Sequence, residues 1–150
     1  MDRIVMSRRA QCLVLLFVLC APACTVGDRR SGLPPAAQNA IDTITDDIAA
    51  GRDDKIYQEA ADEWRQAATP EQSRASFARV RDTFGKVLSR ALVEGREQQA
   101  GAGGTSAAHA VNATFNTRFE RGDAIEAFTL IERDGRWLLA RYAVHSDALR

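Results

Sequence analysis

The stretch Arg121–Val144, RGDAIEAFTLIERDGRWLLARYAV, decides the fold class of this 150-residue chain. At its centre, Asp134-Gly135 is a residue pair typical of a two-residue hairpin turn. Apolar side chains recur on both sides of this pair, as expected of strands that bury one face. The stretch therefore predicts an antiparallel hairpin whose strands cover residues 124–133 and 136–146.

Two further strands are expected before this hairpin. Residues 111–119 alternate between apolar and polar side chains, which is the cleanest strand pattern in the chain. Residues 86–97 alternate more weakly, and Gly95 weakens the far end of that strand. Between them, QQAGAGGTSAA at residues 98–108 predicts a small-residue loop at a hairpin tip. The carboxyl half thus predicts an antiparallel sheet of about four strands.

Three helices are expected in the amino half, because apolar residues recur at helical spacing in residues 35–50, 53–64 and 70–84. Thr69 and Gln72 around Pro70 form a start signal for the third helix, and Gly85 ends it. The fold class is therefore α+β, with three N-terminal helices packed on a curved antiparallel sheet of about four strands.

The expected turns also predict which residues pair. With loops at Asp134-Gly135 and Arg121-Gly122, Phe128 pairs with Arg141 on one side and Phe115 on the other. The same register pairs Glu132 with Trp137, Leu130 with Leu139, and Ala113 with Leu130. A one-residue bulge in either hairpin would reverse part of this pattern.

This register assigns the two faces of the sheet. The face expected under the helices carries Val111, Ala113, Phe115, Phe119, Phe128, Leu130, Trp137 and Leu139. The opposite face carries Ile125, Ile131, Leu138 and Tyr142. A sheet that is apolar on both sides usually has both sides covered, so this second face indicates a surface for another segment or a partner.

The first 23 residues have the layout of a secretory signal. Arg3, Arg8 and Arg9 precede an uncharged, mostly apolar stretch of ten residues, 12–21, and small residues follow it. Ten helical residues rise only about 15 Å, half the thickness of a bilayer core, so a permanent membrane span is not expected. We expect export, with residues 1–23 removed.

The small residues before Cys24, in APAC, resemble a bacterial lipobox. The resemblance implies that Cys24 is acylated, that residues 24–35 form a flexible tether, and that residues 36–150 form one domain. It also implies a location on the periplasmic face of a membrane. Because Thr25 is not the aspartate of inner-membrane retention, the outer membrane is favoured. Simple cleavage that releases a soluble protein starting at Cys24 is the alternative.

The order of helices and strands resembles the cystatin-like, or nuclear transport factor 2-like, superfold. The carboxyl half is similar to small exported bacterial domains of that type without assigned function, over about residues 36–148. The matching positions are Glu126, Phe128, Leu130, Asp134, Gly135, Trp137, Leu139, Tyr142 and Val144. These are packing and turn residues, so the resemblance implies a fold, in which helices on a curved sheet can enclose a conical pocket.

The sequence contains no motif for catalysis, metal binding or a cofactor. His109 and His145 lie outside any nucleophile motif, and we expect both at the surface or at an edge of the sheet. Neither a metal nor a cofactor is expected. The 20 basic and 20 acidic residues balance, which gives no long-range attraction for nucleic acid.

Some enzymes of the resembled superfold use a pocket acid with a tyrosine, and that resemblance implies candidate residues here. They are Tyr57, Glu126, Arg141 and Tyr142, with Phe128 beside them in the expected register. An acid and an arginine beside an aromatic ring can line a pocket for a polar ligand. They can equally form an ordinary cross-strand ion pair.

Two functions without catalysis are consistent with these patterns, and an enzyme that uses the candidate pocket residues is the third alternative. The first is a membrane-anchored periplasmic lipoprotein domain without enzymatic activity, which binds an envelope protein or forms a homodimer through its sheet. The second is a small-ligand-binding module that uses a pocket between helices and sheet.

Overall fold

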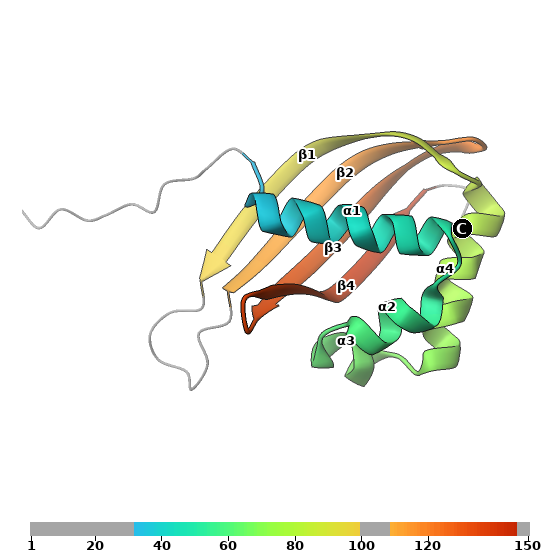
Figure 1. Cartoon of the computed structure of the whole chain (residues 1–150). Coiled ribbons are helices and arrows are strands. Elements are labelled where there is room, and N and C mark those ends of the chain that lie inside the picture. Colours follow the sequence, from blue (N-terminus) through green and yellow to red (C-terminus); the bar gives the residue numbers. More distant parts are fainter. Residues whose placement is uncertain (1–31, 100–108, 147–150) are drawn as a thin grey trace, which may run out of the picture.

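The computed structural model describes residues 32–99 and 109–146, which form helices followed by an antiparallel sheet (Figure 1). The helices are α1 (Pro35–Ala49), α2 (Asp53–Glu59), α3 (Asp62–Ala67) and α4 (Pro70–Phe84). The strands are β1 (Val87–Gln99), β2 (His109–Phe119), β3 (Gly122–Arg133) and β4 (Arg136–His145), in the order β1-β2-β3-β4. The predicted α+β class with a four-stranded antiparallel sheet is confirmed. The leader, Cys24, most of the tether and most of the 98–108 loop lie outside the described residues.

Residues 32–99 contain four helices where three were predicted, so the prediction of three was wrong. The expected second helix breaks at Ala60 and Ala61, where ψ is 161° and 159°. Both alanines are buried, and the Ala61 N–H donates to the Leu139 carbonyl of β4 at 2.9 Å. This bond to the sheet takes the place of a continued helical hydrogen bond. None of the described helices is long and apolar enough to cross a membrane.

The ends of α4 follow the local sequence signals. The Thr69 hydroxyl accepts from the Gln72 N–H, and the Gln72 side chain accepts from the Thr69 N–H, which completes the predicted capping box. Gly85 ends the helix with φ 74° and ψ −148°, a conformation that side chains other than glycine rarely adopt. A Cβ at this position would also lie 2.5 Å from Glu120 Oε2.

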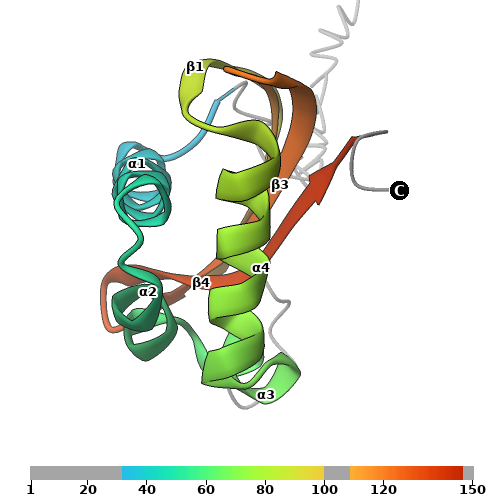
Figure 2. The same ribbon diagram turned by 90° about the vertical axis from the view of Figure 1, so that its right-hand side faces the viewer.

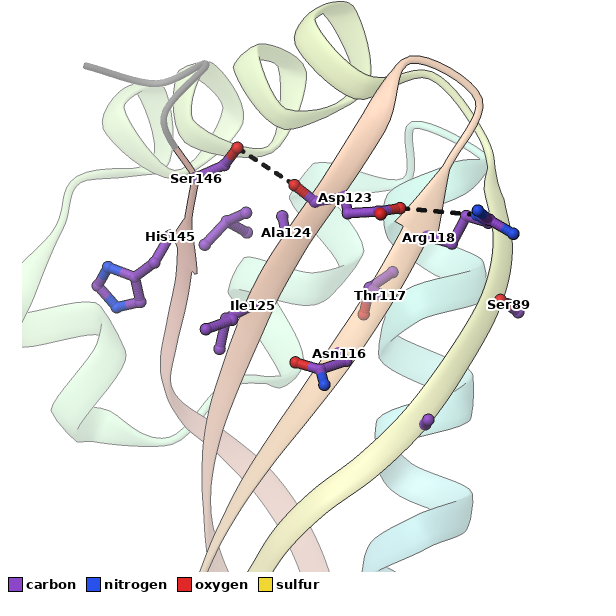
Figure 3. Close-up of a pocket in the computed structure, with 11 residues that line it drawn as sticks. Ser89, Asn116, Thr117, Arg118, Asp123, Ala124, Ile125, His145 and Ser146 are labelled. Atoms are coloured by element: carbon purple, nitrogen blue, oxygen red, sulfur yellow. Dashed lines mark hydrogen bonds and ion pairs between the residues drawn. The ribbon is translucent and has the colours of Figure 1, made fainter.

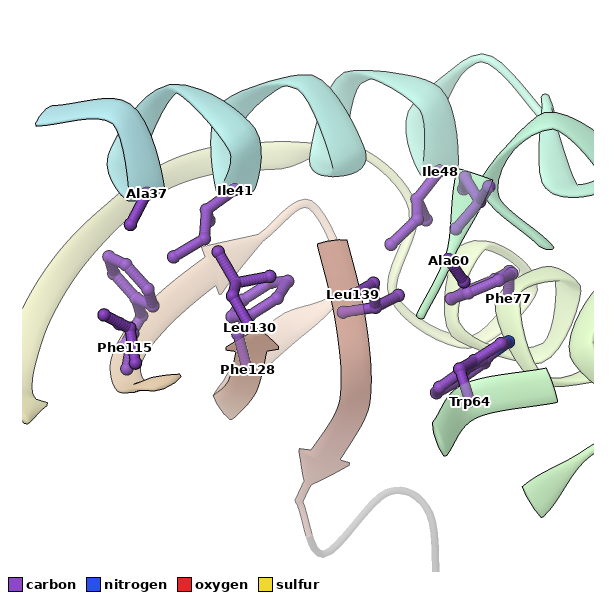
Figure 4. Packing of buried hydrophobic residues seen from close by; sticks show 13 residues of the cluster. Ala37, Ile41, Ile48, Ala60, Trp64, Phe77, Phe115, Phe128, Leu130 and Leu139 are labelled. Atoms are coloured by element: carbon purple, nitrogen blue, oxygen red, sulfur yellow. The ribbon is translucent and has the colours of Figure 1, made fainter. Parts of the chain in front are cut away.

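The core lies between the helices and one curved face of the sheet. Helix α1 crosses this face, and no described helix lies on the other side (Figure 2). Ile41 and Ile48 of α1 point toward Leu130 and Leu139 of the sheet, and Phe77 joins them from α4 (Figure 4). The predicted core face is confirmed, since its residues are buried except for the half-buried Trp137.

The β3–β4 hairpin turns at Asp134 and Gly135, with φ of 51° and 72°, as predicted. Glu132 pairs with Trp137 and Leu130 with Leu139. Beyond them the register shifts between Thr129 and Leu130, so Phe128 pairs with Tyr142. The predicted pairing of Phe128 with Arg141 was therefore wrong. The shift turns Tyr142 to the helix-covered face and Arg141 to the opposite one.

The β2–β3 hairpin turns at Glu120-Arg121, one residue earlier than predicted, and Phe115 pairs with Glu126. The turn is docked on the end of α4, where the Arg121 N–H donates to the Phe84 carbonyl at 3.0 Å. The pairing is displaced by two residues from the predicted register. An even displacement leaves every side chain on its predicted face.

Strand β1 forms one edge of the sheet and carries two irregularities. The register against β2 shifts at Leu88 and again at Val93. Both side chains project into solvent, with exposed fractions of 61% and 58%. These shifts explain why residues 86–97 alternate only weakly.

Candidate functional site

A pocket of about 270 Å³ lies between α1, α4 and the helix-covered face of the sheet. Its apolar wall consists of Ile48 from α1, Val80 from α4, Val87 from β1 and Phe119 from β2. The polar residues that reach it are Thr45, Arg81, Lys86, Arg90, Glu120, Arg121, Glu126 and Tyr142.

Glu126 is the centre of the polar wall and is only 2% exposed. Its Oε2 accepts hydrogen bonds from Arg90 Nε at 2.7 Å and from the Thr117 hydroxyl at 2.5 Å. Its Oε1 accepts from the Tyr142 hydroxyl at 2.8 Å. These residues come from β1, β2, β3 and β4, so this polar cluster connects every strand of the sheet. Such full pairing offsets the large cost of burying a carboxylate.

Tyr142 is held in this cluster by aromatic packing. Its ring centroid lies 4.9 Å from that of Phe128 and 5.8 Å from that of Phe77. Burial raises the pKa of Tyr142 well above its ordinary value, and the Glu126 carboxylate raises it further. The phenol therefore stays protonated and donates to Glu126.

Arg90 reaches the pocket from the edge strand, with 14% of its side chain exposed. The guanidinium carbon lies 5.8 Å from the centroid of the Phe115 ring and 6.0 Å from that of Phe128, within range of a cation–π contact. Nε is bonded to Glu126. The terminal nitrogens Nη1 and Nη2 have no hydrogen-bond partner among residues 32–99 and 109–146.

Arg81 and Arg121 differ from Arg90, because terminal guanidinium nitrogens of both already donate hydrogen bonds. Arg81 binds Asp53 at 2.6 and 2.7 Å and donates to the Ile48 carbonyl at 2.9 Å. Arg121 donates to carbonyl groups of the last turn of α4. Both side chains hold the helix ends in place.

The structure brings together some of the predicted site residues and separates others. Glu126, Phe128 and Tyr142 lie together, although Tyr142 was predicted on the opposite face. Arg141 is exposed on that opposite face, so its predicted place beside Glu126 was wrong. Tyr57 packs against the core from α2 and does not line the pocket.

Sequence reasoning missed Arg90 and Thr117. Thr117 was one residue of an alternating strand and was buried with the apolar set. Arg90 lies in the weakly alternating part of β1. Because the register shifts there, the sequence pattern does not show which face of the sheet each side chain is on. A lone arginine between Leu88 and Leu92 was the available signal.

A second, larger hollow of about 920 Å³ lies on the uncovered face of the sheet (Figure 3). Ile125 in its lining is 45% exposed. Arg118 and Asp123 in its lining lie 3.7 Å apart as an ion pair. The apolar surface predicted on this face was Ile125, Ile131, Leu138 and Tyr142. Because Tyr142 lies on the other face, the remaining residues form two separate groups. Ile131 pairs with Leu138 about 20 Å along the strand from Ile125.

His109 lies at the far end of the sheet, away from the pocket. Its Nδ1 is 2.6 Å from Glu132 Oε2, its Nε2 contacts Glu97, and its ring packs on Trp137. The hydrogen bond to Glu132 raises the pKa of His109. Glu132 and Glu97 thus contact different nitrogens of the imidazole. Residues 32–99 and 109–146 contain no group of three or more His, Cys, Asp or Glu side chains that could hold a metal ion.

Comparison with known proteins identifies a family for most of this domain. Residues 37–142 match the family described as "Protein of unknown function (DUF4019)". No curated protein matches the chain. The matched range begins in α1 and ends in β4, so it includes the helices, the sheet and the Glu126 cluster. The chain therefore belongs to the DUF4019 family.

Proposed function

We propose that the domain is a small-ligand-binding module whose site is the pocket between α1, α4 and the sheet. The observation that carries this proposal is the pocket itself, whose lining combines apolar side chains with Arg90 and the buried Glu126 cluster. Ligand sites are typically apolar clefts of about 300–1,000 Å³ with a few polar groups. A volume of 270 Å³ is just below this range, which favours a small ligand.

Binding is favoured over catalysis by the state of the polar groups. Both oxygens of Glu126 already accept hydrogen bonds, and Tyr142 keeps its proton. A general base needs a free lone pair aimed at its substrate. The cluster is better suited to holding the guanidinium of Arg90 in one orientation.

The resemblance to the cystatin-like or nuclear transport factor 2-like superfold is part of this proposal. Helices across one face of a curved four-stranded antiparallel sheet, with a pocket between the layers, support that assignment.

We also propose that the domain is an exported lipoprotein, anchored through acyl chains on Cys24 at the periplasmic face of the outer membrane. The basic leader, the apolar stretch and the APAC sequence support this anchor. Replacing Cys24 with Ser is expected to move the protein to the soluble fraction, and intact mass of the native protein reports the acyl chains. A bare thiol at the new amino terminus would disprove acylation.

Blocking the pocket tests the ligand-binding proposal. Ala49 is exposed and lines the pocket, so Ala49→Trp fills its mouth without a change in the core. Ala36→Trp, at an exposed position elsewhere on α1, is the matched control. Native mass spectrometry of protein purified from its own envelope should show a small molecule bound to the wild type and to Ala36→Trp, but not to Ala49→Trp. Equal occupancy in all of these proteins would exclude this pocket as the site.

A second candidate function is association with an envelope protein or a second copy through the uncovered face of the sheet. The hollow on that face and the exposed Ile125 favour it. Light scattering after size exclusion is the test. A dimer that Ile125→Asp disrupts would support this function.

A further inference from the structure

We infer that the pocket binds a small apolar molecule that ends in a carboxylate, with Arg90 as the residue that holds the carboxylate. This inference rests on the proposed ligand-binding function and assigns a chemical class to its ligand.

The orientation of Arg90 is the first reason. Its Nε donates to Glu126 at 2.7 Å, and the ring centroids of Phe115 and Phe128 lie 5.8 and 6.0 Å from the guanidinium carbon. The end of the group that carries Nη1 and Nη2 has no partner in the described residues. That end presents the donor spacing to which a carboxylate binds through two parallel hydrogen bonds. With 14% of the side chain exposed, such bonds form largely out of water.

The charges around the pocket are the second reason. Its lining contains the basic residues Arg81, Lys86, Arg90 and Arg121 against the acidic residues Glu120 and Glu126. Glu126 has both oxygens occupied, and the Glu120 carboxylate accepts from the Lys86 backbone N–H at 3.0 Å. Asp53 neutralises Arg81 and Glu126 neutralises Arg90, which leaves Lys86 and Arg121 against Glu120 in the lining. A cationic ligand would therefore find no free carboxylate oxygen at Glu126 and a small excess of positive charge. An anionic ligand is favoured instead.

The apolar wall limits the rest of the ligand. Ile48, Val80, Val87 and Phe119 offer hydrocarbon surface and no charge. A volume of 270 Å³ accommodates a short chain or a single ring. The ligand is then a compact amphiphile with one acidic end.

A charge-matched series of probes tests this class. Octanoate, octan-1-ol and octylamine share one apolar chain and differ in the end group. Their binding to the full chain carrying Cys24→Ser, which needs no detergent, is measured by calorimetry. We expect octanoate to bind best. Arg90→Gln should weaken octanoate about ten- to a hundredfold, the effect of one charged hydrogen-bonding group, and leave octan-1-ol unchanged.

Two further variants test the same assignment if Arg90→Gln does not fold. Arg90→Lys retains the charge but loses the paired donors, and Arg90→Gln with Glu126→Gln removes both members of the ion pair. Arg118→Gln, on the uncovered face, is the control and should bind octanoate like the wild type.

The outcomes separate the ligand class from the pocket. Equal binding of the probes, all blocked by Ala49→Trp, would overturn the carboxylate assignment while the pocket remains a ligand site. Octanoate binding that survives every Arg90 variant, or no octanoate binding at all, would also overturn the assignment. The test of small molecules that co-purify with Ala49→Trp then decides the pocket independently.

Discussion

The hydroxyl of Tyr142 donates to Glu126 Oε1 at 2.8 Å, and a register shift in the β3–β4 hairpin makes this bond possible. The shift lies between Thr129 and Leu130. It turns Tyr142 from the uncovered face to the face under the helices. There the phenol joins Arg90 and Thr117 around the same carboxylate.

Removing this hydroxyl should destabilise the fold. Tyr142→Phe keeps the ring between Phe77 and Phe128 but takes one donor from a buried carboxylate. We expect a loss of about 1–3 kcal/mol in the free energy of unfolding, measured by urea denaturation. Tyr57→Phe is the control, because Tyr57 is half-buried on α2 outside this cluster. Equal effects of the two variants would contradict the role of the hydrogen bond.

Removing one partner of the buried Arg90–Glu126 pair should lower the free energy of unfolding strongly, because the other partner stays buried without its counter-charge. Removing both partners avoids that penalty. Arg90→Met or Glu126→Leu leaves a buried partner without its counter-charge, and each should destabilise the domain by about 3–5 kcal/mol. The double variant should cost clearly less than the two single losses together, which a double-mutant cycle in urea measures. As control, Arg96→Met removes the exposed pair with Glu94 and should cost at most about 1 kcal/mol. Additive losses at Arg90 and Glu126 would refute their coupling.

His109 should make stability depend on pH. Its pKa is raised in the folded protein above the ordinary 6.5, chiefly by the hydrogen bond to Glu132. The folded state therefore binds the proton more tightly than the unfolded chain does. This stabilisation is full below about pH 6.5 and is lost as pH rises through the raised pKa.

Urea denaturation across pH 5.5–9 measures this dependence. We expect the wild type to lose stability over that range and His109→Gln to lose less. His145→Gln, at an exposed histidine on β4, should behave like the wild type. If the stability of the wild type rises with pH over this range, the predicted direction of the pH dependence is wrong.

Gly85 should tolerate alanine less well than Gly51 does. Both have positive φ, 74° and 70°, so a side chain strains either position. At Gly85 a Cβ would also lie 2.5 Å from Glu120 Oε2, whereas at Gly51 nothing lies within 4 Å. Thermal denaturation should show a loss above about 1 kcal/mol for Gly85→Ala and a smaller one for Gly51→Ala. Equal losses would mean that Glu120 moves aside at no cost.

Local chemistry explains the parts of the fold that the sequence predicts. The hairpin at Asp134-Gly135 and the capping box at Thr69 each depend on residues a few positions apart. The β2–β3 register is displaced by two residues from the predicted one. Because side chains alternate with a period of two, the prediction of which residues face the core stayed correct.

Contacts between distant residues explain the parts that could not be predicted. The register shift that moves Tyr142 is accompanied by packing against Phe77 of α4. The break at Ala61 depends on the Leu139 carbonyl of β4. Arg90 joins the candidate site through its hydrogen bond to Glu126, and Glu126 lies two strands away in the sheet. No periodicity within one segment contains this information.

The irregular edge of β1 has a consequence for the behaviour of many copies together. A long outer strand with exposed Leu88 and Val93 is a potential template on which further chains could add and grow into fibres. The interruptions at those residues spoil the even spacing of N–H and C=O groups that an incoming strand needs. Straightening the edge by deleting Val93 should therefore promote polymerisation at high protein concentration.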